Sequence, residues 1–175
     1  MSKFMKSVLY TNPWLIKRVV NPHNERFDKP AVIIANHTSF LDILAVGMLS
    51  PKIIYLVSDW VYNSPVFGIG VKLAGFYPVS KGLEGGVEHL RKKVNQGYSL
   101  MIFPEGTRSQ NNHIHRFHKG AFYLAEEFNL DIVPVIIHGN SEILPKGDFI
   151  INNGNLTVNI LPRITPDDTA YGIGY

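Results

Sequence analysis

Four short runs of β-branched and other apolar residues constrain the fold more than any other feature of this sequence. The runs are AVIIA (31–35), KIIYLVS (52–58), SLMIF (99–103) and DIVPVII (131–137). Runs of this length without alternating polar residues are typical of strands that are buried on both faces. Helical patterns separate them, at residues 40–49, from Asp59 to about residue 74, and at 83–97 and 119–129. Buried strands that alternate with helices predict an α/β fold, with a mostly parallel sheet and helices on both faces.

Two further segments extend the predicted sheet. GFYPV (75–79) is typical of a short strand. FIIN (149–152) and LTVNILP (156–162) are predicted to form a terminal hairpin across Asn153 and Gly154, because such a dipeptide favours a tight turn between strands. The hairpin makes the predicted sheet mixed, although most of it is parallel.

Residues 2–20 place basic residues among apolar and aromatic ones, which is the pattern of an amphipathic helix. Pro13 divides this segment, so we expect two short N-terminal helices, the second capped by Asn12. A basic amphipathic helix can lie in a membrane interface, and packing against the core is the alternative interpretation. No window of the sequence has the run of about 18 apolar residues that a spanning helix needs, so we expect a soluble or peripheral protein.

Length and composition limit the classes of protein to which this chain can belong. Its 175 residues predict a single domain over 1–175, and a longer protein could contain this domain because the ending TAYGIGY has no obvious stop signal. The chain has no cysteine, which excludes disulfides, thiolate metal ligands and a cysteine nucleophile. The formal net charge of +3 is too small to indicate a nucleic-acid partner. His113, His115 and His118 lack the spacing of metal ligands, so we predict no metal site.

Two polar motifs follow predicted strands. NHTSFLD (36–42) comes after the first buried strand, and FPEGTRS (103–109) comes after the third. In sheets of this class, ligands bind where strands end and helices begin. These two motifs therefore hold the candidate functional residues.

In the first motif, His37 and Asp42 are five residues apart, and Asp42 falls early in the predicted helix. Helical side chains tilt toward the N-terminus, so the Asp42 carboxylate can reach the imidazole and fix its tautomer, which leaves the other ring nitrogen as a general base. The alternative interpretation is a capping box, in which Ser39 caps the helix and Asp42 complements the helix dipole. Because no serine nucleophile motif is present, a base at His37 would activate a substrate hydroxyl or water.

The second motif is suited to an anion. Gly106 lets the backbone approach a ligand closely, Thr107 offers a hydroxyl, and the planar fork of Arg108 matches phosphate oxygens. We expect Glu105 either to pair with Arg108 or to bond a substrate hydroxyl. The alternative is a polar turn with a surface pair of Glu105 and Arg108. If the strand ends converge, nearby side chains would add positive charge: Lys81, Arg116, His118 and Lys119.

Together, the motifs resemble those of the glycerolipid acyltransferase superfamily, of the 1-acylglycerol-3-phosphate acyltransferase type. That family has an Asn-His-x-x-x-x-Asp block, a Phe-Pro-Glu-Gly-Thr-Arg-Ser block, a Phe-x-Lys-Gly pattern, and a Val-Pro-Val strand followed by glycine. The matching residues here are, in chain order, Asn36, His37 and Asp42, then 103–109, 117–120 and 133–139. The resemblance spans residues 30 to about 140, which is most of the chain.

The resemblance implies an acyltransferase of phospholipid biosynthesis. Such an enzyme moves a fatty acyl group from an acyl thioester, on coenzyme A or acyl carrier protein, to a hydroxyl of a lysophospholipid or glycerol-phosphate-like acceptor. By this resemblance His37 is the general base and Asp42 orients it, and no cofactor is needed beyond the acyl-thioester co-substrate. The residues that it implies for binding the acceptor are Lys81, Glu105, Gly106, Thr107 and Arg108.

The sequence also departs from the family pattern. The family often has a basic residue near the start of its second block and an arginine after the short strand, where this chain has Ser58-Asp59-Trp60 and Lys81. The acceptor could therefore be another lysolipid, a lyso-amino-acid lipid or a non-phosphate alcohol. A non-catalytic lipid- or phosphate-binding module and a thioesterase-like hydrolase stay open. Members of the family are usually membrane-bound, so we expect peripheral contact on the cytoplasmic side, through residues 2–20 and 59–70.

Overall fold

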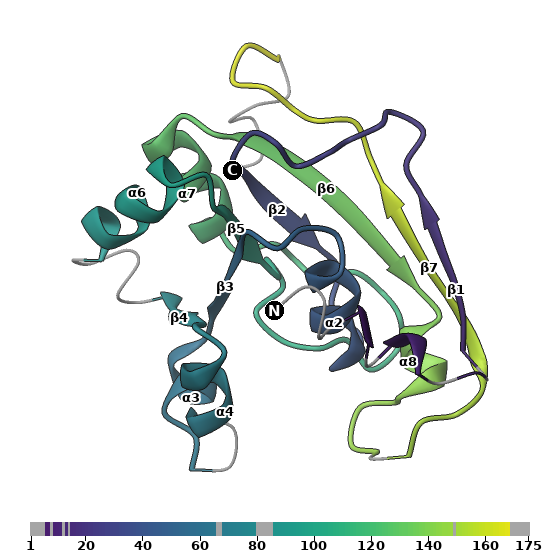
Figure 1. Cartoon of the computed structure of the whole chain (residues 1–175). Coiled ribbons are helices and arrows are strands. Elements are labelled where there is room, and N and C mark those ends of the chain that lie inside the picture. Colours follow the sequence, from purple (N-terminus) through teal and green to yellow (C-terminus); the bar gives the residue numbers. More distant parts are fainter. Residues whose placement is uncertain are drawn as a thin grey trace.

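The computed structural model describes residues 6–7, 9–11, 13, 15–65, 68–79, 86–148 and 150–168, which form one mixed sheet with helices on both faces (Figure 1). The strands are β1 (Leu15–Val20), β2 (Ala31–Ala35), β3 (Ile53–Val57), β4 (Tyr77–Pro78), β5 (Ser99–Ile102), β6 (Asp131–His138) and β7 (Gly154–Ile160). The helices are α2 (Leu41–Gly47), α3 (Asp59–Tyr62), α4 (Gly68–Leu73), α6 (Val87–Asn95), α7 (Gly120–Phe128) and α8 (Asn140–Ile143).

The strand order is β1-β7-β6-β2-β5-β3-β4. The central strand β2 runs parallel to both of its neighbours, β5 and β6, and β3 runs parallel to β5 and to β4. Strand β7 pairs antiparallel with β6 and parallel with β1. The predicted fold class, a mixed and mostly parallel α/β sheet, is therefore confirmed.

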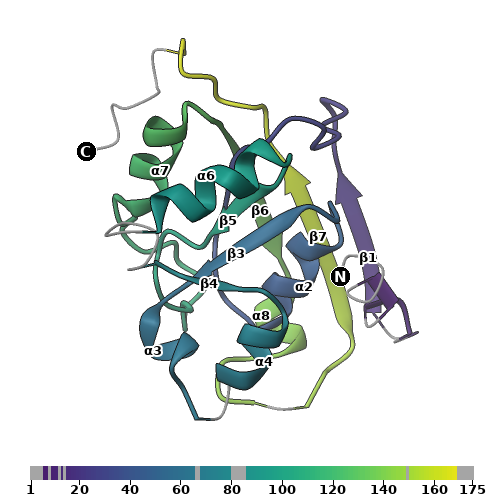
Figure 2. The same ribbon diagram turned by 60° about the vertical axis from the view of Figure 1, so that its left-hand side comes forward.

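Strand β2 separates two apolar cores, because its successive side chains point to opposite faces of the sheet. Ile33 belongs to the core beneath α2 and α8, whereas Val32 and Ile34 belong to the core beneath α6 and α7 (Figure 2). All five residues of β2 are buried, as the unbroken apolar run predicts. The sheet is therefore covered on both sides, and the polar side chains that follow β2 and its neighbours lie at the ends of the strands.

The second predicted N-terminal helix is wrong, because residues 15–20 form strand β1. This segment pairs residue by residue with β7, from Leu15 with Gly154 to Val20 with Asn159. Its β-branched residues favour a strand, and the backbone hydrogen bonds to β7 override the helical pattern. Residues 6–7 and 9–10 are helical, in agreement with the first predicted helix, and Asn12 lies outside the described residues.

The predicted terminal hairpin is also wrong. Residues 150–152 form no strand, because Asn152 is tied to α8: its backbone N–H donates to the Ile143 carbonyl oxygen over 2.8 Å. Strand β7 begins at Gly154 and pairs with β6 and β1 instead. The antiparallel pair that makes the sheet mixed is therefore β6 with β7.

The helix predicted from Asp59 to about residue 74 is divided into α3 and α4. Residues 63–65, which include Pro65, are not helical, because proline disfavours helical backbone in the residue before it. The other predicted helices and strands are present with slightly shifted ends, and residues 83–85 lie outside the described part of the chain. None of the helices within the described ranges has the length and hydropathy that crossing a bilayer requires.

Candidate active site

The two polar motifs meet at one edge of the sheet. His37 follows β2 and Glu105 follows β5, and these strands are adjacent and parallel, so both motifs leave the sheet at the same edge. Two hydrogen bonds join them. The His37 backbone N–H donates to Glu105 Oε1 over 2.8 Å, and the Ser109 backbone N–H donates to the His37 carbonyl oxygen over 2.7 Å.

His37 and Asp42 form a hydrogen-bonded pair. His37 Nδ1 lies 2.9 Å from Asp42 Oδ2. An ionised carboxylate can only accept hydrogen bonds, so Nδ1 carries a proton, and in the neutral imidazole Nε2 then keeps its lone pair. The imidazole stacks on the Phe103 ring, with ring centroids 4.0 Å apart, and its side chain stays 15% exposed. The ring is therefore held from two sides, and part of it remains in contact with solvent.

Asp42 is completely buried and is surrounded by donors. Besides His37, its Oδ2 accepts the backbone N–H groups of Thr38, over 2.7 Å, and Ser39, over 2.8 Å. Its Oδ1 accepts Asn140 Nδ2 over 2.7 Å. These donors come from the turn before α2 and from the first residue of α8. They stabilise the ionised carboxylate at a position where an unpaired charge would be very costly.

The capping-box interpretation is confirmed in part. The residue directly before α2 is Phe40, but the Leu41 backbone N–H donates to Ser39 Oγ over 3.3 Å, and the Ser39 backbone N–H donates to Asp42 Oδ2. The Ser39 hydroxyl donates to the Leu144 carbonyl oxygen over 2.8 Å, which fastens the segment after α8 to the turn before α2. Ser39 is therefore a structural tether between the two segments that supply the donors of Asp42.

The expectation that Glu105 pairs with Arg108 is wrong. Its side chain is buried, and each carboxylate oxygen accepts a backbone N–H: His37 on Oε1 and His115 on Oε2, both over 2.8 Å. Loops that leave a strand have unpaired N–H groups, and a buried carboxylate satisfies two of them here. Glu105 thus fixes the backbone of His37 and the loop that follows the second motif.

Arg108 stacks on the ring of Phe40, with its guanidinium carbon 3.9 Å from the ring centroid. Burial lowers the pKa of Arg108 from its ordinary value, and the charge of Asp42 partly offsets this. Within the described residues the guanidinium has no ion pair, so its planar fork is available to an anion. The backbone carbonyl of Arg108 accepts Lys146 Nζ over 2.9 Å.

The remaining predicted site residues are less tightly placed. Gly106 has φ +67°, and a Cβ there would lie 3.2 Å from the His118 ring, so glycine suits this turn. Thr107, Arg116, His118 and Lys119 are exposed. Lys81 lies outside the described residues. In the part of the chain that the structure describes, no three histidine, aspartate or glutamate side chains gather as a metal site would require.

Two asparagines lie at the same edge: Asn36, which belongs to the first motif, and Asn140, which sequence reasoning missed. Asn36 directly follows β2 and makes two hydrogen bonds to Ile137 of β6: its Nδ2 donates to the Ile137 carbonyl oxygen, and its Oδ1 accepts the Ile137 backbone N–H. Asn140 follows Gly139 at the end of β6. A search for polar residues at the end of every parallel strand would have found Asn140, because β6 ends at the same edge as β2.

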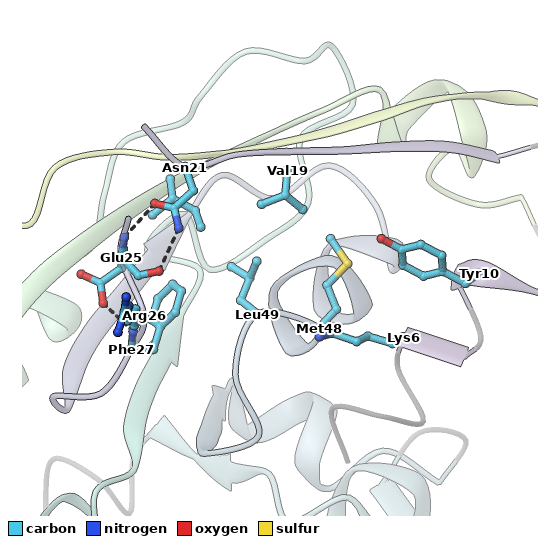
Figure 3. A pocket seen from close by; sticks show the side chains of 10 residues that line it. Lys6, Tyr10, Val19, Asn21, Glu25, Arg26, Phe27, Met48 and Leu49 are labelled. Carbon is cyan, nitrogen blue, oxygen red and sulfur yellow. Dashed lines mark hydrogen bonds between the residues drawn. The ribbon is translucent and has the colours of Figure 1, made fainter. Parts of the chain in front are cut away.

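An open cavity of about 370 Å³ lies elsewhere in the molecule (Figure 3). Met48 and Leu49, which follow α2, form part of its wall, whereas Asp42 is in the first turn of that helix. The other residues that line it are Lys6, Tyr10, Val19, Asn21, Glu25, Arg26, Phe27 and Ile160. None of the candidate site residues borders this cavity, so it is separate from the edge that holds His37.

Comparison with known proteins extends the likeness beyond the motifs. The family model described as Acyltransferase matches residues 17–138. A chloroplastic 1-acyl-sn-glycerol-3-phosphate acyltransferase of Arabidopsis thaliana is 33% identical over 138 residues, which cover 76% of this chain and 39% of that protein. The 1-acyl-sn-glycerol-3-phosphate acyltransferase of Saccharomyces cerevisiae is 31% identical over 151 residues, or 80% of this chain and 49% of that protein. This chain thus spans less than half the length of either relative.

A solved structure resembles the whole chain. It is the 1-acyl-sn-glycerophosphate acyltransferase PlsC of Thermotoga maritima, which superposes with a TM-score of 0.76. The match covers 97% of this chain and 69% of the PlsC chain. Its sequence identity is 22%, so this similarity establishes the fold alone.

Proposed function

Because the chain belongs to the acyltransferase family, we propose that it transfers a fatty acyl group from an acyl thioester to a hydroxyl of a lysophospholipid or related glycerol-phosphate acceptor. The observation that carries the proposal is the hydrogen-bonded pair of His37 and Asp42. On the adjoining motif, the guanidinium of Arg108 stacks on Phe40 and has no ion pair among the described residues. The pair supplies a base but no protein nucleophile, and the guanidinium supplies a site for a phosphate.

In the proposed reaction, His37 Nε2 removes the proton of the acceptor hydroxyl as its oxygen attacks the thioester carbonyl carbon. The new carbon–oxygen bond forms, the carbon–sulfur bond breaks, and the protonated imidazole returns its proton to the leaving thiolate. Asp42 Oδ2 accepts the hydrogen bond from Nδ1–H throughout and stabilises the imidazolium that forms. A base positioned in this way accelerates a reaction by roughly 10²–10⁴-fold.

Arg108 supports a phosphate-bearing acceptor. Its guanidinium is planar, half-buried and held over the Phe40 ring, so little freedom remains to be lost when it binds an anion in a bidentate manner. Gly106 and Thr107 precede it on the exposed turn and could contact the same ligand. Lys81 remains a proposed contact from the sequence alone. We propose no cofactor, because the thioester is already activated for transfer.

The direct test measures free thiol from an acyl thioester, with and without a panel of acceptor alcohols. Acyl-coenzyme A and acyl carrier protein thioesters are separate arms, since both present the same reacting group. We expect thiol release only when a phosphate-bearing lysolipid is present, with loss of about 10²-fold or more in His37→Ala. His138→Ala is the matched control, because His138 is exposed at the end of β6 and its side chain takes no part in the site.

The outcomes separate the alternatives. Full activity in His37→Ala would refute the proposal. Thiol release that does not depend on an acceptor would indicate a thioesterase-like hydrolase. Lipid binding without turnover would indicate a non-catalytic module, and preference for an acceptor without phosphate would indicate another alcohol or a lyso-amino-acid lipid.

We also propose that the protein works at a membrane surface, on the cytoplasmic side. Exposed apolar side chains support this proposal, because they lie on segments that leave the sheet at the edge that holds His37. On α3 and α4 they are Trp60, Ile69 and Leu73, which are 68%, 70% and 84% exposed. Figure 2 shows α3, α4 and α8 at one end of the molecule.

The membrane proposal is tested by flotation with vesicles that contain anionic lipid. We expect Leu73→Ser to weaken vesicle binding, because a large apolar side chain at a membrane surface contributes through its buried area. Tyr123→Ser is the control, since Tyr123 is an exposed residue of α7 and belongs to neither α3 nor α4. Equal binding by the two variants would contradict the proposal.

A further inference from the structure

The geometry points to Asn140 as a positioning residue, which holds the Asp42 carboxylate so that His37 keeps the tautomer required of a base. This inference rests on the proposed role of His37 and adds a residue that the sequence motifs do not contain. Asn140 is 98 positions from Asp42 in the chain, yet its Nδ2 lies 2.7 Å from Asp42 Oδ1.

The two oxygens of Asp42 have different partners. Oδ2 accepts His37 Nδ1 and the backbone N–H groups of Thr38 and Ser39, all from the segment just before α2. Oδ1 accepts only the side chain of Asn140 among the described residues. Rotation of the carboxylate is therefore opposed by the donors to Oδ2 and, independently, by a contact to Oδ1 from another part of the chain. Without that contact, Oδ1 would be an unpaired, completely buried acceptor.

The orientation of the Asn140 amide is fixed by its partner. A carboxylate can only accept, so the NH₂ group must face Asp42 and the carbonyl must point away. The Asn140 side chain is completely buried, and its Oδ1 has no hydrogen-bond partner among the described residues. Reversing the amide would place two acceptors against each other, so only one of the two orientations is compatible with an ionised Asp42.

A purely structural asparagine would be expected to use both ends of its amide. Asn36 does so, because its Nδ2 and Oδ1 bond the carbonyl and the N–H of Ile137. Asn140 instead leaves a buried carbonyl unpaired, which is unfavourable and rare in folded proteins. The hydrogen bond that its side chain does make is the one to Asp42. An unfavourable feature such as this unpaired carbonyl is typical of residues that serve a functional group.

The backbone places Asn140 with little freedom. It is the first residue of α8 and follows Gly139, whose φ of +89° turns the chain away from β6. A Cβ at Gly139 would collide with the Asn155 backbone carbonyl, so β7 lies directly against this turn. The Ser39 hydroxyl also ties Leu144, just after α8, to the turn before α2. The donor is thus held on a rigid support, which a positioning residue requires.

The test compares Asn140→Leu, which removes the donor and keeps a similar volume, with Asn152→Leu. Asn152 also anchors α8, since its Nδ2 donates to the Glu142 carbonyl oxygen over 3.2 Å, but it has no hydrogen bond to Asp42 in the described chain. The first readout is ¹⁵N NMR of the His37 ring in the full chain, which distinguishes a proton on Nδ1 from one on Nε2. The second is the separation of kcat from KM for a lysophospholipid acceptor.

We expect Asn140→Leu to lose part of its Nδ1–H tautomer and to show a kcat about 10- to 100-fold lower, as a misplaced catalytic group does, with little change in KM. Asn152→Leu should keep the wild-type tautomer. A folded Asn140→Leu protein with the wild-type tautomer would overturn the inference, and so would an equal change in Asn152→Leu. If Asn140→Leu does not fold, Asn140→Ala replaces it with the same expectations.

The two failures can be told apart because the tautomer measurement does not need turnover. A wild-type protein that releases no thiol would refute the proposed function whatever the NMR result. A wild-type protein that is active, with a tautomer that does not depend on Asn140, would refute the positioning role alone.

Discussion

The clearest prediction concerns Glu105→Gln, which changes one atom of a buried side chain. The wild-type carboxylate accepts two backbone N–H groups, from His37 and His115, on different oxygens. Glutamine keeps one carbonyl oxygen but turns a second donor toward the other N–H. One of the two hydrogen bonds is therefore lost, and a partly buried N–H is left without an acceptor.

The magnitude follows from the charge on the acceptor. Hydrogen bonds to charged groups contribute about 1.5–3 kcal/mol each, and the N–H that loses its acceptor is only partly buried, so we expect the free energy of unfolding to fall by about 2–3 kcal/mol. For a chain of this size, that loss lowers Tm by roughly 5–15 °C. The same substitution releases the His37 backbone, so kcat should fall while KM for the acceptor changes little.

The assay is urea denaturation combined with steady-state kinetics, with Glu127→Gln as the control. Glu127 makes an exposed ion pair with Arg91, at 2.8 Å, and a surface pair of this kind contributes less than about 1 kcal/mol. If Glu105→Gln costs no more stability than Glu127→Gln, the assignment of Glu105 to the backbone of His37 is refuted. A higher KM at unchanged stability would favour the other expectation, in which Glu105 bonds a substrate hydroxyl.

Two further predictions test the frame around the site. Gly139 and Gly147 both have positive φ, but of these two only Gly139 would bring a Cβ against the backbone, at Asn155. We expect Gly147→Ala to lower the free energy of unfolding by about 1–2 kcal/mol, and Gly139→Ala to lower it by about 1–3 kcal/mol more. Urea denaturation measures both losses, and equal losses would contradict this expectation. Hydrogen bonding to Arg163 lowers the pKa of Glu25 below its ordinary value of 4.5, so the stability from this pair is present above pH 4.5 and is lost as the pH falls through the lowered pKa. Acid unfolding of Arg163→Met should therefore show a shallower loss of stability in this range, and an identical pH dependence would argue against the pair.

The sequence was most informative where local patterns decide the structure. The central strands were predictable because residues such as those of β2 are buried on both faces, so the run itself has no polar positions. The contact of His37 with Asp42 was predictable because both residues lie within one turn of a helix start, where tilt and spacing determine which side chains meet.

Features that depend on distant parts of the chain were not predictable in this way. Strand β1 has a partner, β7, about 140 positions later, and without that partner its residues have the pattern of an amphipathic helix. Glu105 reaches His37 across 68 positions and Asn140 reaches Asp42 across 98. No local pattern records such contacts, because they arise only when neighbouring strands bring their ends together.

The two borders of the sheet have a consequence for how the protein behaves at high concentration. An outer strand with free backbone N–H and C=O groups can recruit a strand from another molecule and begin aggregation. Here one border is β4, which has only two residues, and the other is β1, whose middle residues are Lys17 and Arg18. A short border and a charged one both oppose such recruitment, so crowding of these molecules should not lead readily to sheets shared between chains.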